Sequence, residues 1–152
     1  MSVDPTGVFE TWEAHIRDSF PFPVYVSELP EDDELQFDSR GTMTPYIVLS
    51  FGGPVRSAGG RGIVSTRRDS QIVFLTVEVY APTSDIARKL KGKIIDALLG
   101  YRVFSGGDQI TGELTFSGGM SYSRSSNTIR PTQYIEAQSF QTVTNLIVGD
   151  VI

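Results

Sequence analysis

Residues 70–81, SQIVFLTVEVYA, form the stretch that decides the fold. Strand-forming side chains dominate it, and their alternation places Val73, Leu75, Val77 and Val79 on the same face of an extended chain. This face is uniformly apolar. The segment therefore predicts a long strand whose Val/Leu face meets the core.

One helix is expected before this strand, over residues 5–19, PTGVFETWEAHIRDS. Val8, Trp12 and either His15 or Ile16 recur there at three- and four-residue spacing, which is typical of an amphipathic helix. Pro5 fits the first turn of such a helix. The histidine is expected to be a half-exposed helix residue.

A second helix is expected after the strand, over residues 83–99, TSDIARKLKGKIIDALL. Thr83 or Ser84 can cap its N-terminus, and Gly100 suits its C-terminal end. Its apolar stripe consists of Ile86, Leu90, Ile94, Ala97 and Leu98. Its solvent side is expected to carry Arg88, Lys89, Lys91 and Lys93.

The remaining pattern is mainly extended. Strands are expected at residues 24–26, 45–52, 112–119, 120–126 and 132–146, with a polar, acidic linker between the first two and a turn at residues 125–131. The composition of residues 52–62, GGPVRSAGGRG, favours a mobile loop or a long hairpin arm. Neither face of residues 132–146 is apolar along its length, which indicates an edge strand or an element shared between subunits.

Together these elements predict one α+β domain over residues 1–146, followed by a C-terminal tail at 147–152. The sheet is expected to be mostly antiparallel, with mixed character, and to carry two main helices and an extended loop or hairpin arm.

Composition limits the chemistry of the chain. Its 152 residues are 39% hydrophobic and 20% charged, a soluble globular composition without a membrane-spanning run, and its N-terminus does not resemble a signal peptide, so we expect a cytoplasmic site of synthesis and assembly. The chain contains no cysteine, so disulfides and thiolate metal sites are excluded. His15 is its one histidine, and a Ser–His–Asp triad would have to include it.

Charge is unevenly distributed along the chain. The net charge is −5, but residues 1–40 contain ten acidic and two basic residues, whereas residues 41–152 contain eight acidic and eleven basic residues. The two parts therefore have net charges of −8 and +3. This asymmetry permits head-to-tail attraction between copies and disfavours simple DNA binding, which requires a dominant basic face.

The glycines and arginines of residues 51–69 raise the question of a phosphate site. The segment lacks the lysine of a Walker loop, is followed by a strand where that loop requires a helix, and has no GxGxxG pattern. We expect its arginines to contact carboxylates of a neighbouring copy instead. The candidates for a subunit interface, or for the lining of a lumen, are Arg56, Arg61, Arg67, Arg68, Asp69, Arg124 and Arg130. The acidic partner candidates are Glu31, Asp32, Asp33 and Glu34. These four consecutive acidic residues repel one another and are therefore expected to be exposed.

No catalytic set emerges from the remaining residues. No spacing singles out a pair of the 18 acidic residues for acid–base chemistry, and EDDELQFD at 31–38 lacks the framework of a calcium loop. We therefore expect an interaction protein without enzyme activity, metal or cofactor.

Three stretches of the chain carry a family resemblance: YIVLSFGGPVR (46–56), STRRDSQIVFLTVEVYAPTSDIAR (65–88) and GGMSYSRSSNTIRPTQYIEAQSFQTVTNL (118–146). They resemble the tail terminator proteins of long, flexible-tailed bacteriophages, particularly those of phages infecting actinobacteria. The resemblance covers about two thirds of the chain, roughly residues 45–146. It contains no invariant motif, so it transfers no functional residue.

The resemblance implies an α+β subunit of a homo-hexameric ring in the virion, at the head–tail junction. Such a ring binds the head-proximal end of the tail tube, ends its growth and presents a docking surface to head-completion or stopper proteins. Phage DNA passes through its lumen. Two alternatives stay open: another head–tail connector or tail-completion protein, and, from a different class, a small nucleic-acid-binding domain that acts as a monomer.

A charge reversal in the arginine-rich segment tests the interface assignment. Arg67→Glu or Arg68→Glu is expected to weaken ring assembly, because each removes a cation that holds a neighbour's carboxylate. Light scattering on a sizing column measures the assembled mass, and an unchanged hexamer mass would count against the assignment. A strongly salt-dependent affinity of the ring for DNA would instead place these arginines in the lumen.

Overall fold

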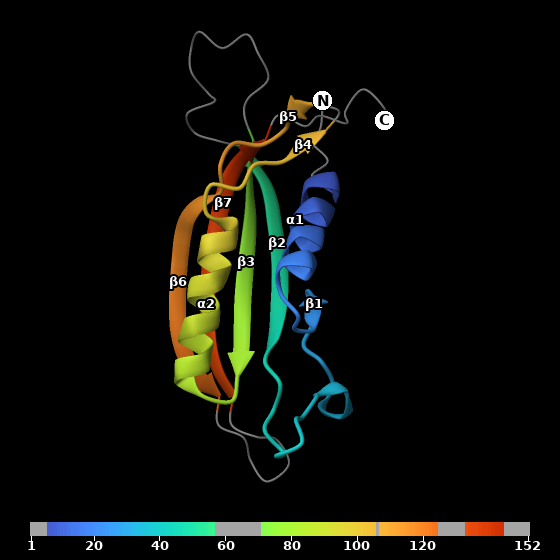
Figure 1. The fold of residues 1–152 in the computed structure, drawn as a ribbon. Coiled ribbons are helices and arrows are strands. Elements are labelled where there is room, and N and C mark those ends of the chain that lie inside the picture. The colour runs from blue at the N-terminus through green and yellow to red at the C-terminus, as the bar shows by residue number, and fades with distance from the viewer. Residues whose placement is uncertain (1–5, 57–70, 106, 125–132, 145–152) are drawn as a thin grey trace, which may run out of the picture.

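The computed structural model describes residues 6–56, 71–105, 107–124 and 133–144. Its main feature is a five-stranded sheet with the strand order β1-β2-β3-β7-β6 (Figure 1). The strands are β1 (Val24–Val26), β2 (Tyr46–Arg56), β3 (Gln71–Ala81), β6 (Thr115–Arg124) and β7 (Gln133–Thr144). Only β1 runs parallel to its neighbour, so the sheet is mixed and mostly antiparallel. The expected α+β class is confirmed.

Two helices, α1 (Thr6–Ser19) and α2 (Ser84–Leu98), lie on the same face of this sheet (Figure 1). A short 3₁₀ helix, η1 (Asp32–Glu34), interrupts the acidic linker. Two further strands, β4 (Phe104–Ser105) and β5 (Asp108–Gln109), pair with each other in a small hairpin that the sequence did not indicate.

The core forms where the Val/Leu face of β3 meets the helices. Val73, Leu75, Val77 and Val79 are all buried, as predicted. Cross-strand neighbours on β2 and the core-facing residues of the two helices join them in one cluster. Burial of these β-branched and aliphatic side chains supplies the main driving force for packing the helices on the sheet.

The N-terminal helix buries Val8, Trp12 and Ile16, which resolves the ambiguous position in favour of the isoleucine. His15 is half-buried beside this stripe. Its Nε2 donates a hydrogen bond to the Ala97 carbonyl oxygen at 3.0 Å, since a carbonyl can only accept, and its ring stacks on Tyr101 at 4.0 Å. The expected half-exposed histidine therefore joins α1 to the end of α2.

The stripe predicted for α2 is partly wrong. Ala87, Leu90, Ile94 and Leu98 are the buried positions, whereas Ile86 is 38% exposed. Leu90, Ile94 and Leu98 are thus buried as predicted, whereas Ala87 replaces Ile86 as the first buried position. The predicted Ala97 is half-buried. The ends were predicted correctly: Thr83 Oγ1 accepts from the Ile86 N–H at 3.2 Å, and Gly100 has a φ of +83°.

The predicted end of the second strand is also wrong. β2 continues beyond Gly52 to Arg56, across a register shift between Gly52 and Val55. Gly53 has a φ of +86°, and a Cβ there would lie 2.6 Å from the Ile72 carbonyl oxygen. The glycine therefore allows the strand to pass an irregularity rather than starting a loop. The rest of the predicted arm, residues 57–62, lies outside the described residues.

One strand, β6, lies where two were predicted, at residues 112–119 and 120–126. β6 runs from Thr115 to Arg124, with a register shift between Phe116 and Gly118. Gly119 keeps this segment against β7, because a Cβ there would lie 3.0 Å from the Gln138 side-chain oxygen. The apparent break at the glycines is thus a bulge within a continuous strand. The predicted turn at 125–131 falls outside the described part of the chain.

The last strand is not an edge strand, contrary to the prediction. β7 lies between β3 and β6 and pairs with both. Its mixed pattern reflects buried polar side chains that have partners: Gln133 Oε1 accepts from the Tyr46 hydroxyl at 3.0 Å, and the Gln138 side-chain amide donates to Gly118. Satisfied polar groups are tolerated inside a sheet, so polarity here does not indicate an edge.

A second, smaller cluster covers part of the other sheet face. Met43, Tyr46, Val48, Tyr80 and Ile135 are buried there, and Tyr46 stacks on Tyr80 with 4.7 Å between the ring centroids. The linker between β1 and β2 supplies Met43 and the half-buried Leu35. This linker therefore packs against the sheet at the β1 side and is not merely a solvated connection.

A glycine in α2 provides a test of the helix assignment. Gly92 is exposed, and a Cβ added there would meet no atom within 4 Å. Gly92→Ala is therefore expected to raise the free energy of unfolding by about 0.5–1 kcal/mol, because alanine loses less backbone entropy in a helix. Urea unfolding followed by circular dichroism measures the change.

Gly53→Ala is the matched control, and it should lower the free energy of unfolding because of the φ of +86° and the close Ile72 oxygen. A stability of Gly92→Ala equal to that of the parent would argue against a regular helix at this position.

Candidate functional site

Most of the arginines predicted at an interface cannot be placed. Arg61, Arg67, Arg68, Asp69 and Arg130 lie outside the described residues. The main chain of the other two is in strands: Arg56 pairs with Gln71 at the end of β2, and Arg124 pairs with Gln133 at the end of β6. These register positions put the two arginines at opposite ends of the sheet's long axis, so they do not share a site.

The acidic candidates lie together beside β1. We call residues 28–38 the acidic segment, since they contain six acidic residues and no basic residue. Glu31, Asp33 and Glu34 are exposed, and Asp32 begins η1. The Glu31 N–H donates to Glu34 Oε1 at 3.0 Å, so this carboxylate closes the turn locally. The prediction that these residues are exposed is confirmed for the three side chains that the structure describes.

The charge of the acidic segment reaches a neighbouring phenol. Burial raises the pKa of Tyr25 above its usual value, and the Glu34 carboxylate raises it further, because both disfavour the phenolate. This tyrosine also packs edge-on against Tyr46, at 5.8 Å between ring centroids. Tyr25, which stays uncharged, thus lies between the acidic segment and the smaller cluster.

Basic residues gather on the other side of the molecule, on α2, which packs against β7 and β3. We call the exposed residues Arg88, Lys89 and Lys93 the basic helix face. Lys89 pairs with Asp85 on the same helix at 3.1 Å. Figure 1 shows α1 and the acidic segment on the β1 side of the sheet and α2 in front of β6 and β7 on the other side.

The prediction that Lys91 lies on the solvent side of α2 is wrong. Its side chain is 21% exposed and pairs with Glu136 of β7 at 3.7 Å, where the glutamate side chain is 11% exposed. Lys91 lies one helical turn after the buried Ala87 and one turn before the buried Ile94, so it is on the side of α2 that packs against the sheet. The interaction explains why a glutamate can lie on the helix-covered face of an interior strand.

Within the described ranges, β6 forms a long edge of the sheet. β6 has ten residues and, among the strands that the structure describes, pairs only with β7. It contains no proline and no lysine, the residues that commonly block pairing at an edge, and its one charged residue is Arg124. The opposite edge differs: β1 covers three residues of β2, and Pro54, without an N–H, interrupts the outer backbone further along.

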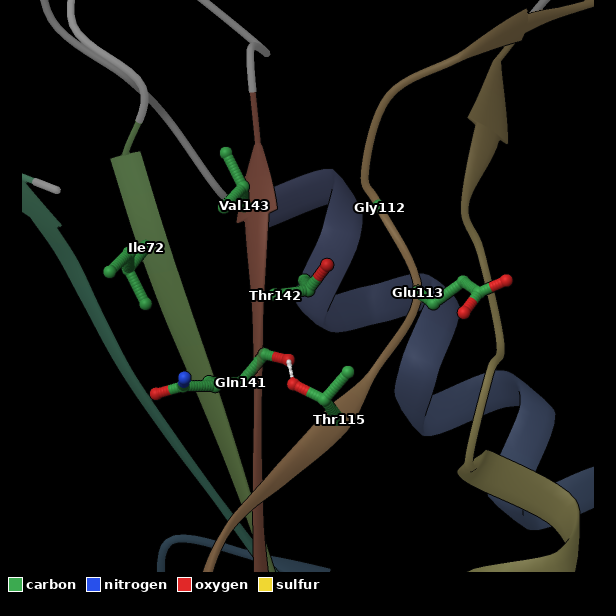
Figure 2. Close-up of a pocket in the computed structure, with 7 residues that line it drawn as sticks. All are labelled: Ile72, Gly112, Glu113, Thr115, Gln141, Thr142 and Val143. Carbon is green, nitrogen blue, oxygen red and sulfur yellow. Dashed lines mark hydrogen bonds between the residues drawn. The ribbon is translucent and has the colours of Figure 1, made fainter. Parts of the chain in front are cut away.

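A pocket of about 350 Å³ opens beside this edge, between β7 and the chain that leads into β6 (Figure 2). Gly112 and Glu113 line one side, and Thr142 and Val143 of β7 line the other. Thr142 Oγ1 is buried and has no hydrogen-bond partner. The lining offers two threonine hydroxyls, one side-chain amide and one carboxylate. The carboxylate, Glu113, is already paired with Arg102, so these residues show no catalytic set.

No site for a metal ion is evident in the described ranges, where no three His, Asp or Glu side chains converge. Within the same ranges, none of the helices is long and apolar enough to cross a membrane.

No protein-family model matches the chain, and a search of curated proteins finds no significant relative. The functional interpretation therefore depends on the chain's own residues and on the resemblance of residues 45–146 to tail terminator proteins.

Sequence reasoning missed two features of this part of the molecule: the β6 edge and the Lys91–Glu136 pair. The β6 edge was missed because a strand is an edge when no second strand pairs with it, and the residues of the strand itself do not show which strands pair. One signal in the sequence pointed to the Lys91–Glu136 pair. Glu136 and Phe140 are four residues apart in an expected strand, so they share a face, and a large aromatic residue such as Phe140 indicates that this face is buried.

The Lys91–Glu136 pair predicts unequal effects for two lysines on one helix. Lys91→Met is expected to lower the free energy of unfolding by about 1–3 kcal/mol, because it leaves a buried carboxylate without its partner. Lys89→Met removes only an exposed pair and should change the free energy by about 0.5 kcal/mol or less. Urea denaturation of both variants at equal protein concentration measures the difference. Equal effects would show that the Glu136 pair contributes nothing beyond a surface pair.

Proposed function

We propose that the chain is a structural protein of a bacteriophage tail that assembles into a hexameric ring. The ring caps the head-proximal end of the tail tube, ends its polymerisation and presents a docking surface to head-completion proteins. Its partners are sister copies, the tail tube protein and a head-completion or stopper protein, and phage DNA passes through its lumen. Its place is the head–tail junction of the virion, after assembly in the host cytoplasm, and it performs no enzymatic reaction.

The observation that carries the proposal is the unprotected edge of β6. Among the strands that the structure describes, this ten-residue strand pairs on one side only, and it contains neither proline nor lysine, so it is a template for another chain. The opposite edge is a poorer template, because Pro54 of β2 lacks an N–H, so the two edges are unlike surfaces. An interface between unlike surfaces is head-to-tail, and such an interface closes into a ring when its rotation divides a full turn.

The distribution of charge also supports a head-to-tail interface. The acidic segment lies at the β1 side, while α2, with four basic and two acidic residues, lies over the side of the sheet that ends in β6. Complementary charge steers copies into one orientation and opposes like-to-like contacts. The resemblance adds the particular role: its matching stretches contain all of β2, β3 and β7 and most of β6, the strands that build this sheet.

The nucleic-acid alternative has less support. A DNA-binding surface requires cations that are free to neutralise phosphates. On α2, Lys89 and Lys91 are already paired with carboxylates, and Asp85 and Asp96 also lie on the helix. A connector or tail-completion protein would share the ring geometry, so the two roles differ in what the ring binds and not in how it forms.

Electron microscopy of the purified chain, with and without tail tubes, tests the proposal. We expect closed rings with a central channel in negative stain, and rings at one end of each tube when tubes are added. Rings that bind an isolated head connector but no tube would favour the connector role. A chain that stays monomeric at high concentration, or that binds DNA as a monomer, would overturn the proposal.

A charge swap tests the head-to-tail interface. The first variant, Glu31→Lys with Asp33→Lys, reverses exposed residues of the acidic segment, and the second, Arg88→Glu with Lys93→Glu, reverses the basic helix face. Each alone should raise the protein concentration required for assembly by about tenfold or more, because like charges then meet across the interface. Light scattering over a dilution series measures this concentration, and circular dichroism checks that each variant is folded.

The decisive sample is an equimolar mixture of the two variants. In a head-to-tail ring the mixture restores assembly, because each contact then joins surfaces of opposite charge. Poor assembly of the mixture, with both variants folded, would exclude this pairing of surfaces without excluding a ring.

A further inference from the structure

The basic helix face contains an aliphatic side chain that the fold leaves in solvent. Ile86 is exposed, although its position in the sequence suits the apolar stripe of α2. It lies one helical turn before Lys89 and two turns before Lys93, so these three side chains share one side of the helix. Ile86 is therefore an exposed apolar residue with cations beside it.

The acidic segment contains an exposed apolar side chain in the opposite surroundings. Phe37 is 49% exposed. Residues 28–40 around it carry six acidic residues and one basic residue, Arg40, which gives this stretch a net charge of −5. The aromatic ring is therefore presented to solvent in a strongly negative part of the surface.

Hydrogen bonds hold Phe37 in an ordered turn. Its main chain pairs with that of Met43, which is buried in the smaller cluster and fixes the turn to the sheet. The Asp38 N–H donates to the Thr42 carbonyl oxygen at 2.8 Å. Asp38 Oδ1 accepts from the N–H groups of Arg40 and Thr42 at 2.8 and 2.9 Å. An aromatic side chain on an ordered turn loses little conformational entropy when a partner buries it, which favours it as an anchor.

The surroundings of Phe37 and Ile86 complement each other and do not complement themselves. Contact between the two residues removes both from water and places the acidic segment against the basic helix face. Contact between two acidic segments, or between two basic helix faces, would bring like charges together. Figure 1 shows the acidic segment on the β1 side of the sheet and α2 over its other side, so the contact joins two copies.

We propose that Phe37 of one copy docks on Ile86 of the next copy and forms the apolar centre of the contact between the acidic segment and the basic helix face. The surrounding charges orient the two copies, and the aromatic anchor supplies most of the affinity. This inference rests on the proposed ring, because it names the residues that meet at its head-to-tail interface.

Alanine substitutions at the two positions test the proposal. Phe37→Ala and Ile86→Ala are each expected to raise the protein concentration required for assembly about tenfold or more. The double variant should raise it by clearly less than the product of the two single effects, because each single variant already removes the shared contact. Light scattering over a dilution series measures this concentration, and circular dichroism checks that each variant is folded.

The matched control is Phe104→Ala, which removes a phenylalanine that is 55% exposed on β4, outside both surfaces. It should change the concentration required for assembly by less than about twofold. An effect as large as that of Phe37→Ala would show that the loss is not specific to the proposed contact and would count against it.

Disulfide formation between copies tests the same contact without weakening assembly. The chain has no native cysteine, so a mixture of the single variants Phe37→Cys and Ile86→Cys can form only bonds between the introduced thiols. After mild oxidation, we expect peptide mass spectrometry to identify a disulfide that joins residues 37 and 86 of different copies. The control mixture, Phe104→Cys with Ile86→Cys, should give at least about fivefold less mixed product.

The outcomes separate this contact from the ring itself. If the parent chain forms rings and both alanine variants assemble at the parental concentration, the docking of Phe37 on Ile86 is wrong and the ring stands. Single effects that multiply fully in the double variant, or a disulfide yield no greater than that of the control mixture, would overturn the contact in the same way. A parent chain that stays monomeric would overturn the ring and this contact together.

Discussion

The pairing of β3 on both sides is the constraint on which the rest of the structure depends. All eleven of its residues pair with β7, and most also pair with β2, so its two faces are fixed in space. One face presents the alternate residues Val73, Leu75, Val77 and Val79, and it is buried because α1 and α2 pack on it. The other face presents Tyr80, which is buried because the linker before β2 returns to the sheet. Both layers around the sheet therefore follow from one strand.

Polar contacts decide how the helices sit on that surface, since apolar packing alone is not directional. Lys91 joins α2 to β7 through Glu136, and His15 joins α1 to the end of α2 through the Ala97 carbonyl. Each contact is half-buried, where a lost partner is costly. The same rule applies to the interior strand β7, where buried glutamines are tolerated only because they have hydrogen-bond partners such as the Tyr46 hydroxyl.

The two edges of the sheet are unlike, and this asymmetry is the feature on which the proposed assembly rests. One edge carries Pro54 and the acidic segment, and the other is the open strand β6 with a predominantly basic helix beside it. A protein that must remain single protects both edges, whereas a subunit of a head-to-tail ring requires two different surfaces.

The sequence by itself determined the elements whose signal is local: the strand centred on Leu75, both helices, the Thr83 cap, the turn at Gly100 and the exposure of the acidic segment. Only the tertiary structure decided that β7 is an interior strand, that β6 is one continuous edge strand, that Ile86 faces outward and that Lys91 points to the sheet. The physical reason is that alternation reports which side chains share a face, whereas strand order depends on backbone pairing between residues as distant in sequence as Leu75 and Phe140. Glycine has the same ambiguity, because a residue that permits a loop also permits a bulge, and the neighbouring strand selects between them.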